Sequence, residues 1–304
     1  MIKQLLVVLA CLSWVAPSLA FSGKIALTFD DAPTPDSALL TGAERTDKII
    51  AALHKQKVQD ALFFVKADNL NTTTLPRLKR YTSAGFHIAN HSYSHRSANE
   101  ISSEDFLTDA YRAHLALKDL DNFLPYFRPP YLHYGKDLDS IGYIQTNLAK
   151  LDYQDGFVTI DNADWYINSL LVNAASEGKK INFAKARRLY VQVMWQAIEF
   201  FDALARTTYG ASAPHVLLLH ENDTTALFLG DLIAHIRKQG GDIIAPQEAF
   251  GDPIYRQFPM SYFQKQGRVA AMAQLHGVPI ERLKHPAEDS QYLDALFKQH
   301  AVFQ

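Results

Sequence analysis

The segment Lys24-Ile-Ala-Leu-Thr-Phe-Asp-Asp31 decides the fold of this chain, because an apolar run ends there on two adjacent carboxylates. Such a run is typical of a buried strand in a parallel sheet. About sixty residues later, Asn90-His-Ser-Tyr-Ser-His95 places two imidazoles at the spacing H-x-x-x-H. One carboxylate and two imidazoles form a three-ligand site for a divalent ion, with one position left open for water. We therefore expect a metal-dependent hydrolase.

Short apolar runs alternate with amphipathic stretches along the rest of the chain. Repeated strand-then-helix units predict an α/β fold with a parallel sheet, and seven units predict a distorted or incomplete (β/α)7 barrel. Catalytic groups in such a barrel belong at the C-terminal ends of the strands. The predicted strands are Ile25–Phe29, Ala61–Val65, Phe86–Ala89, Tyr126–Phe127, Phe157–Ile160, Val216–Leu219 and Asp242–Ile244. The predicted helices are Glu44–Gln56, Thr73–Ala84, Ser102–Phe123, Asp137–Leu148, Phe183–Arg206 and Thr225–Gln239.

Three regions are predicted along the chain. Residues 1–20 have the pattern of a signal peptide, with Lys3, an apolar run and small residues before a cut after Ala20. Residues 21–250 form the barrel, and residues 251–304 form a helical C-terminal extension. The alternative to cleavage is lipid attachment at Cys11, the only cysteine. We expect export to the periplasm or exterior. The apolar run is too short for a membrane span, so no transmembrane anchor is expected in the mature chain.

The composition restricts the partners of this protein. The chain of 304 residues is 48% hydrophobic and 20% charged, as is ordinary for a globular protein. Its formal net charge is −2, and removal of residues 1–20 with Lys3 makes it −3. Binding to nucleic acid requires a strong basic excess, so no nucleic-acid partner is expected. A neutral polymer remains compatible with this charge, and the oligomeric state is left open.

Five segments together resemble the NodB-type polysaccharide deacetylases, which are carbohydrate esterase family 4. They cover roughly residues 24 to 245 and occur in the order of the family. A single one of these motifs would be weak, whereas five in order on alternating strand and helix units are specific. The segments are Thr28-Phe-Asp-Asp31, His91 to His95, Arg128-Pro-Pro-Tyr131, Asp161-Asn-Ala-Asp-Trp165 and Val216-Leu-Leu-Leu-His220.

The resemblance implies that Asp31, His91 and His95 bind the metal and that Asp30 is the general base. Zinc is the default ion for two nitrogens and one oxygen, and cobalt or nickel also suits this donor set. A bound metal lowers the pKa of its water, and a neighbouring carboxylate can take the proton. Taken separately, the aspartates can be a turn or helix cap and the histidines ordinary surface residues.

Arg128 is implied by the family to pair with Asp30 and hold it ionised and aimed. Because Pro129 and Pro130 have no backbone N–H, Tyr131 supplies the first amide after Arg128. The family uses the corresponding amide to stabilise the oxyanion of the tetrahedral intermediate. The alternatives are an ordinary surface ion pair for Arg128 and a core aromatic at a strand end for Tyr131.

His220 is implied to be the general acid that protonates the departing amine, a task suited to an imidazole. A buried core histidine is the alternative. Asp161 is expected to hydrogen-bond and orient His220, with Asp164 as the competing candidate. Trp165 and Leu218 either form the wall of a pocket for the acetyl methyl group or belong to the core.

The expected reaction is removal of acetyl groups from N-acetylated hexosamines in a polysaccharide or oligosaccharide such as peptidoglycan, chitin or poly-N-acetylglucosamine. The acetylated glycan is therefore the expected partner. One rival is an O-acetyl esterase acting on xylan or another glycan, and the other is a non-catalytic glycan-binding protein. The long segment Pro33 to Glu44 carries Asp36 and Glu44 as candidates for extra groove contacts, and His133 is a weaker candidate for a substrate contact.

Overall fold

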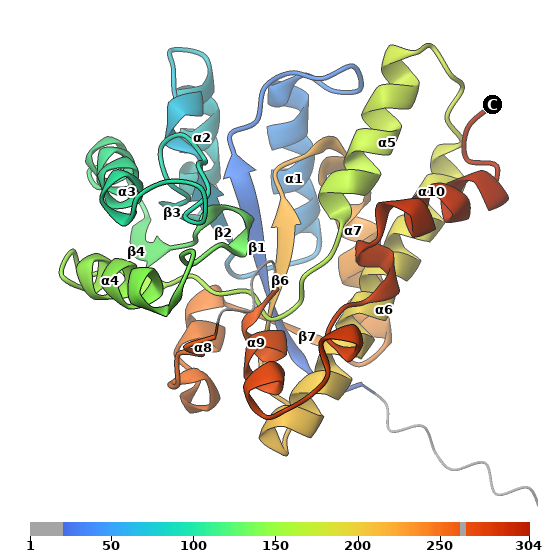
Figure 1. Ribbon diagram of the computed structural model, residues 1–304. Coiled ribbons are helices and arrows are strands. Elements are labelled where there is room, and N and C mark those ends of the chain that lie inside the picture. Colours follow the sequence, from blue (N-terminus) through green and yellow to red (C-terminus); the bar gives the residue numbers. More distant parts are fainter. Residues whose placement is uncertain (1–20, 262–265) are drawn as a thin grey trace, which may run out of the picture.

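The computed structural model describes residues 21–261 and 266–304. The predicted signal peptide, residues 1–20 with Cys11, lies outside the described residues. A parallel sheet of seven strands forms the centre of the molecule, and helices surround it (Figure 1). The strands are β1 Lys24–Ala32, β2 Leu62–Val65, β3 His87–Asn90, β4 Phe123–Phe127, β5 Gln154–Asp155, β6 His215–His220 and β7 Asp242–Ile244.

The order of the strands is β5-β4-β3-β2-β1-β6, with β7 paired to β1, and all of these pairs are parallel. The sheet curls, and a single parallel bridge between Ile160 and Leu217 brings the segment after β5 to β6. This arrangement confirms the predicted incomplete (β/α)7 barrel. β1 is buried along nearly its whole length because it lies in the middle of the sheet.

The helices begin and end where local side chains allow. At the start of α1, Thr41 and Glu44 form a capping box, and Ser102 accepts from Asp105 N at the start of α3. Gly210, with φ 74°, ends α6. The longer helices are α1 Gly42–Lys55, α2 Thr74–Ser83, α3 Ser103–Leu117, α4 Leu138–Ala149, α5 Asp164–Ser176, α6 Phe183–Tyr209, α7 Asp223–Lys238, α9 Arg268–Leu275 and α10 Ser290–Gln299. The short helical elements are α8 Pro246–Phe250, η1 Ala67–Asn69, η2 Pro130–Leu132, η3 Pro253–Tyr255, η4 Ile280–Arg282 and η5 Pro286–Glu288.

The predicted fifth strand, Phe157–Ile160, is wrong, because β5 is the earlier pair Gln154–Asp155. The buried side chain of Arg128 donates hydrogen bonds to backbone carbonyls that would otherwise pair with a neighbouring strand. Its Nε donates to the carbonyl of Gly156 at 2.7 Å and its Nη2 to that of Phe157 at 3.3 Å. Only Ile160 then makes a bridge.

One predicted helix ends earlier than expected, and one helix was not predicted. The helix predicted to reach Phe123 ends at Leu117, because Asn122 has a left-handed backbone, φ 57°, and β4 begins at Phe123. The helix predicted at Phe183–Arg206 is confirmed as α6, and α5 precedes it across a turn at Gly178 with φ 70°.

The C-terminal extension packs on the barrel through the main hydrophobic core. Leu283, Leu293 and Phe297 belong to the same buried cluster as Leu189 and Val193 of α6. In Figure 1 the extension, drawn in red, runs along α6 and reaches α5. An antiparallel bridge between Phe303 and Ile181 fixes its end. Within the part of the chain that the structure describes, no helix is long and apolar enough to cross a membrane.

Candidate active site

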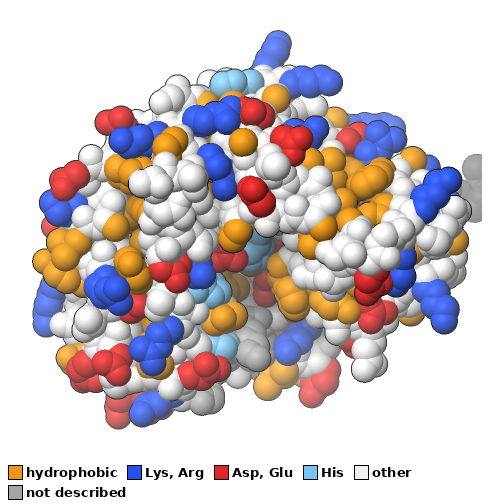
Figure 2. All heavy atoms as spheres, turned by 90° about the horizontal axis from the view of Figure 1, so that it is seen from above, with side chains coloured by type: hydrophobic (Ala, Val, Ile, Leu, Met, Phe, Trp, Pro, Cys, Tyr) orange, Lys and Arg blue, Asp and Glu red, His pale blue; other side chains and the backbone are white. Residues whose placement is uncertain are grey.

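The ends of β1 and β6 bring the first candidate residues side by side. Asp30 and His220 are paired in register, and Glu221 N donates to the carbonyl of Asp30 at 2.9 Å. Both strands point to the top of the molecule in Figure 1. Figure 2 shows this face from above, hollowed near its centre, with histidine side chains visible in the hollow. The candidate residues therefore face the C-terminal ends of the strands, as the barrel architecture requires.

Asp31, His91 and His95 converge at this end of the sheet. Asp31 Oδ1 lies 3.8 Å from His91 Nε2 and 3.3 Å from His95 Nε2. One ligand atom from each of the three residues lies within 4.8 Å of the others. Among residues 21–261 and 266–304, this is the one group of three or more His, Cys, Asp or Glu side chains arranged to hold an ion.

The chemistry of these three side chains fits a divalent ion. His91 Nδ1 donates to the carbonyl of Arg128 at 2.8 Å, which leaves the lone pair of Nε2 for a metal. Burial lowers the pKa of His95 to about 4, so its imidazole is neutral. Asp31 Oδ1 is buried, and no described residue donates a hydrogen bond to it. A buried carboxylate oxygen without a donor is costly unless a cation satisfies it.

Charges at the site keep the Asp31 carboxylate ionised. Burial alone would raise its pKa, but His220, His91 and His95 together lower it. The ionised form of the carboxylate is the form that metal binding needs.

Backbone strain is concentrated at the candidate residues. Asp31, His95 and Tyr131 have left-handed backbones, with φ of 66°, 56° and 60°. Non-glycine residues in this region cost about 1–3 kcal/mol each and persist where the surrounding structure imposes them, often at active sites. The strain is consistent with a site shaped for function.

Asp30 is held by a buried arginine. Arg128 Nη1 donates to Asp30 Oδ1 at 2.5 Å and to Thr28 Oγ1 at 3.0 Å. The guanidinium stacks on Phe64 at 3.9 Å from the ring centroid and is fully buried. The ordinary surface ion pair considered for Arg128 is therefore wrong. The second oxygen of Asp30 lies 3.6 Å from His91 Nε2, next to the candidate metal position.

The carboxylate that contacts His220 is Asp164, so the prediction that Asp161 orients this histidine is wrong. Asp164 Oδ1 accepts from His220 Nδ1 at 2.6 Å, and its Oδ2 accepts from the backbone N–H of His220 at 2.9 Å. Asp164 is fully buried at the first position of α5. Burial alone would lower the pKa of His220, but Asp164, followed by Asp31 and Asp30, raises it to about 10.

Asp161 lies three residues before Asp164, outside α5, and makes no hydrogen bond with His220. Its Oδ1 accepts from Asn162 N at 2.8 Å, and its side chain lines the central cavity. Burial and the neighbouring Glu288 carboxylate raise the pKa of Asp161 to about 8. The sequence alone could not separate the two aspartates, because both belong to the segment Asp161-Asn-Ala-Asp-Trp165 and the start of α5 decides their directions.

A cavity of about 1080 Å³ joins these residues. Tyr131 and Trp165 line it with side chains that are 55% and 52% exposed, and Leu218 contributes a buried apolar surface. The alternative of a core aromatic is therefore wrong for Tyr131, and Trp165 is not a core residue either. The ring of Tyr131 packs edge-on against His95, with centroids 4.6 Å apart. His133, the weaker candidate for a substrate contact, also lines the cavity.

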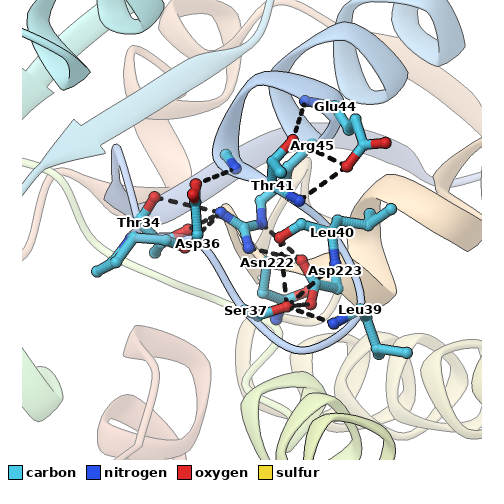
Figure 3. Close-up of polar contacts among 12 residues, drawn as sticks. Thr34, Asp36, Ser37, Leu39, Leu40, Thr41, Glu44, Arg45, Asn222 and Asp223 are labelled. Carbon is cyan, nitrogen blue, oxygen red and sulfur yellow. Dashed lines mark hydrogen bonds and ion pairs between the residues drawn. The ribbon is translucent and has the colours of Figure 1, made fainter. Parts of the chain in front are cut away.

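Asp36 and Glu44 have structural roles, and the expectation that they contact a groove is wrong. Asp36 accepts from Gly42 N at 2.7 Å, and Glu44 completes the capping box of α1 (Figure 3).

The segment that contains Asp36 and Glu44 also contacts the residues that follow β6. Arg45 Nη2 lies 2.6 Å from Asp223 Oδ1, and both side chains are buried, while Ser37 Oγ donates to the other oxygen of Asp223. The loops after Asp31 and after His220 are thereby held together.

The sequence did not identify which residues of the C-terminal extension line the cavity. Gln266, Lys284, His285 and Glu288 line the same space as His220 and Trp165. No short motif marks these residues, and the only signal was the presence of polar side chains in a predicted helical tail.

Fold and site together define a NodB-like barrel with a candidate single-metal centre at the ends of its strands. Residues 22–147 match the family model described as polysaccharide deacetylase. This match, together with the fold, confirms the resemblance of the sequence to the NodB-type polysaccharide deacetylases, carbohydrate esterase family 4.

Two curated relatives match parts of the chain. A peptidoglycan-N-acetylglucosamine deacetylase of Bacillus cereus is 30% identical over 165 residues, which cover 50% of this chain and 52% of that protein. A chitin deacetylase of Colletotrichum lindemuthianum is 31% identical over 144 residues, covering 44% of this chain and 54% of that protein. The chain thus spans about half the length of these relatives.

Solved structures share the fold. A peptidoglycan N-acetylglucosamine deacetylase crystallised with an N-hydroxybenzamide derivative superposes with a TM-score of 0.53 at 19% identity, over 77% of this chain and 90% of that one. A family 4 pseudoenzyme from Bacillus anthracis has a TM-score of 0.50 at 19% identity, over 76% of this chain and 66% of that one. At these identities the likeness concerns the fold alone.

Proposed function

We propose that this protein is a metal-dependent deacetylase that hydrolyses the acetamide of N-acetylated hexosamines in a polysaccharide or oligosaccharide and releases acetate. The observation that carries the proposal is the convergence of Asp31, His91 and His95 beside Asp30 in a cavity that also contains His220. The relatives that act on peptidoglycan and chitin support the substrate class.

Asp31, His91 and His95 would hold the ion, and zinc is the default, with cobalt or nickel as further candidates for this donor set. When bound, the ion supplies Lewis acidity that activates water and polarises a carbonyl. The chain supplies the remaining groups. Arg128 aims the side chain of Asp30 at the attacking water, and Asp30 takes the proton that the water loses.

Collapse of the tetrahedral intermediate requires a proton on the leaving nitrogen. His220, oriented through its Nδ1 by Asp164, presents Nε2 to the cavity and donates that proton as the C–N bond breaks. The backbone N–H of Tyr131 stabilises the oxyanion in this proposal, and Trp165 with Leu218 surrounds the acetyl methyl group. The free amine and acetate are the products.

The test is acetate release by metal-loaded protein from chitin oligomers, peptidoglycan and acetylated xylan. We expect release from the N-acetylated substrates, and Asp30→Asn should reduce it by roughly 10²- to 10⁴-fold, the usual contribution of a general base. Release from xylan alone would make the protein an O-acetyl esterase. Glycan binding without turnover, retained in Asp30→Asn, would indicate a binding protein and contradict the proposal.

Export is a separate part of the proposal, because residues 1–20 have the pattern of a signal peptide. Cell fractionation and N-terminal sequencing of the mature protein test it. A start at Phe21 supports cleavage after Ala20, a lipid-modified Cys11 supports the alternative, and an uncleaved cytoplasmic chain contradicts export.

A further inference from the structure

The C-terminal extension adds a wall rich in hydrogen-bond acceptors to the cavity. Gln266 and Glu288 of the extension line the same space as Asp161 of the barrel. The cavity, about 1080 Å³, is at the upper limit of the usual 300–1,000 Å³ of ligand pockets, so it has room beyond a single sugar unit. These three residues have no role in the reaction proposed above.

The carboxylate of Glu288 raises the pKa of Asp161 more strongly than the charge of His220 lowers it. Burial raises the pKa of both groups, and the charge of Glu288 raises that of Asp161 further. Among the described residues, neither carboxylate forms an ion pair with lysine or arginine. Lys284 is exposed and has only a small effect on Glu288, and the Nδ1 of His220 is bound to Asp164. Such a pair costs folding free energy.

Gln266 adds a buried acceptor that has no hydrogen-bond donor among the described residues. Its side chain is only 4% exposed, and its Nε2 donates to Glu288 Oε2 at 2.5 Å. Its Oε1 is buried, and no group in the described part of the chain donates to it. Backbone amides fix the two carboxylates, since Asn162 N donates to Asp161 and His285 N donates to Glu288 at 2.8 Å each. The acceptors are therefore held in place without a donor that joins them.

We propose that Asp161, Glu288 and Gln266 form a subsite for the ammonium group of a glucosamine unit that neighbours the acetylated unit in the same glycan chain. This inference rests on the proposed function. An ammonium has three donors and a positive charge, which suits two carboxylates and a buried carbonyl. A divalent ion suits this wall less well than an ammonium does. Among the described residues, the three side chains arranged to hold a metal ion are Asp31, His91 and His95.

The proposed reaction creates this ligand. Hydrolysis of each acetamide leaves an amine on the glycan, and neighbouring carboxylates in the subsite favour its protonated form. An enzyme with this subsite would favour chains that already carry a free amine beside the next acetylated unit. Deacetylation would then proceed in runs along the glycan.

Calorimetric titration of the zinc-loaded full chain with a glucosamine trimer and with an N-acetylglucosamine trimer tests the subsite. Glu288→Gln should weaken binding of the glucosamine trimer by about tenfold and change binding of the acetylated trimer much less. Asp294→Asn removes the same charge from the same extension at an exposed side chain that does not line the cavity, and this control should keep the wild-type ratio of the two affinities. Equal losses for both trimers in Glu288→Gln would overturn the subsite.

A second measurement distinguishes a binding role from a structural one. The fold raises the pKa of both carboxyl groups, and a carboxyl group with a raised pKa costs stability above its unfolded pKa, so Asp161→Asn and Glu288→Gln should each raise the Tm by about 2 to 4 °C at pH 7. If Glu288→Gln does not fold, Asp161→Asn carries both tests. A lowered Tm in the two variants, or a second divalent ion bound per wild-type chain and lost in Glu288→Gln, would overturn the proposal.

The two proposals can fail separately. The glucosamine trimer has no acetyl group, so its binding does not depend on turnover. Acetate release with equal affinities of wild type and Glu288→Gln for this trimer would refute the subsite and leave the deacetylase intact. Selective binding of the trimer without acetate release from any substrate would refute the deacetylase alone.

Discussion

Asp164 holds His220 at two points, with one carboxylate oxygen on the Nδ1 of the ring and the other on the backbone N–H. The ring therefore has one tautomer and one direction, and Nε2 is the nitrogen left for chemistry. Asp164 can act in this way because it is the first residue of α5 and is fully buried against the end of β6.

Asp164→Asn should lower kcat by about 10- to 100-fold with little change in KM, since the amide cannot accept at both points and favours the wrong tautomer. Steady-state kinetics on an N-acetylglucosamine oligomer measures the effect. The same substitution at Asp161 is the matched control and should lower kcat much less. Similar losses of kcat at the two positions would contradict the assignment of Asp164.

Metal removal should abolish acetate release, and zinc or cobalt should restore it. Zinc at about 100 times its Kd should also stabilise the chelated protein by about 2.7 kcal/mol, seen as a rise in Tm. His95→Ala should lose this rise, because it removes one of the three converging ligand atoms. His133→Ala is the control, because it removes another histidine of the same cavity, and the zinc-dependent rise in Tm should persist in this variant. A rise that persists in His95→Ala would locate the ion elsewhere.

Arg128→Met should destabilise the protein by about 3–5 kcal/mol, because it leaves the buried Asp30 without its cation. Urea unfolding measures the free energy. The double variant Asp30→Asn with Arg128→Met should recover part of the loss, since it removes the uncompensated charge. A double variant that is as unstable as the sum of the single variants would show that the pairing contributes nothing.

Arg45→Met should destabilise the protein by about 3–5 kcal/mol for the same reason, because Arg45 and Asp223 are 2% and 0% exposed. Lys24→Met is the control, since Lys24 and Glu248 form an ion pair of similar length with both side chains about half exposed. Solvent screens that pair, so no measurable change in unfolding is expected. If Arg45→Met and Lys24→Met changed the free energy of unfolding equally, burial of the ion pair would not explain the destabilisation.

Asp202 should contribute stability only above acidic pH. Burial alone would raise its pKa, but hydrogen bonds from His215 and Arg206 lower it to about 2. A folded pKa below the unfolded value near 3.8 stabilises the native state above about pH 4, and this stabilisation is lost as the pH falls to about 2. Asp202→Asn should therefore cost about 1 to 2 kcal/mol at pH 7 and nothing near pH 2.

Urea unfolding of wild type and Asp202→Asn between pH 2 and 7 measures this difference. Asp119→Asn, at a side chain that is 82% exposed, is the control. A destabilisation by Asp202→Asn that stays constant over the whole pH range would mean that packing, and not charge, is responsible.

Sequence patterns were sufficient where a feature is local. An apolar run ending on Asp30 and Asp31 indicates a strand, and a strand in a parallel sheet brings its last residues to the active end. The predicted strands β1, β2, β3, β6 and β7 were accordingly found within a few residues of their expected bounds. The fifth strand was missed because the partner of its carbonyls is a side chain from the preceding segment, Arg128.

The sequence by itself determined the barrel, its strand ends and the residues able to bind a metal, because periodicity and short motifs are properties of neighbouring positions. Only the tertiary structure decided that Asp164, not Asp161, holds His220, and that Glu288 and Gln266 reach the cavity. Those contacts join residues far apart in the chain, and their geometry depends on how α5 and the extension pack against the completed barrel.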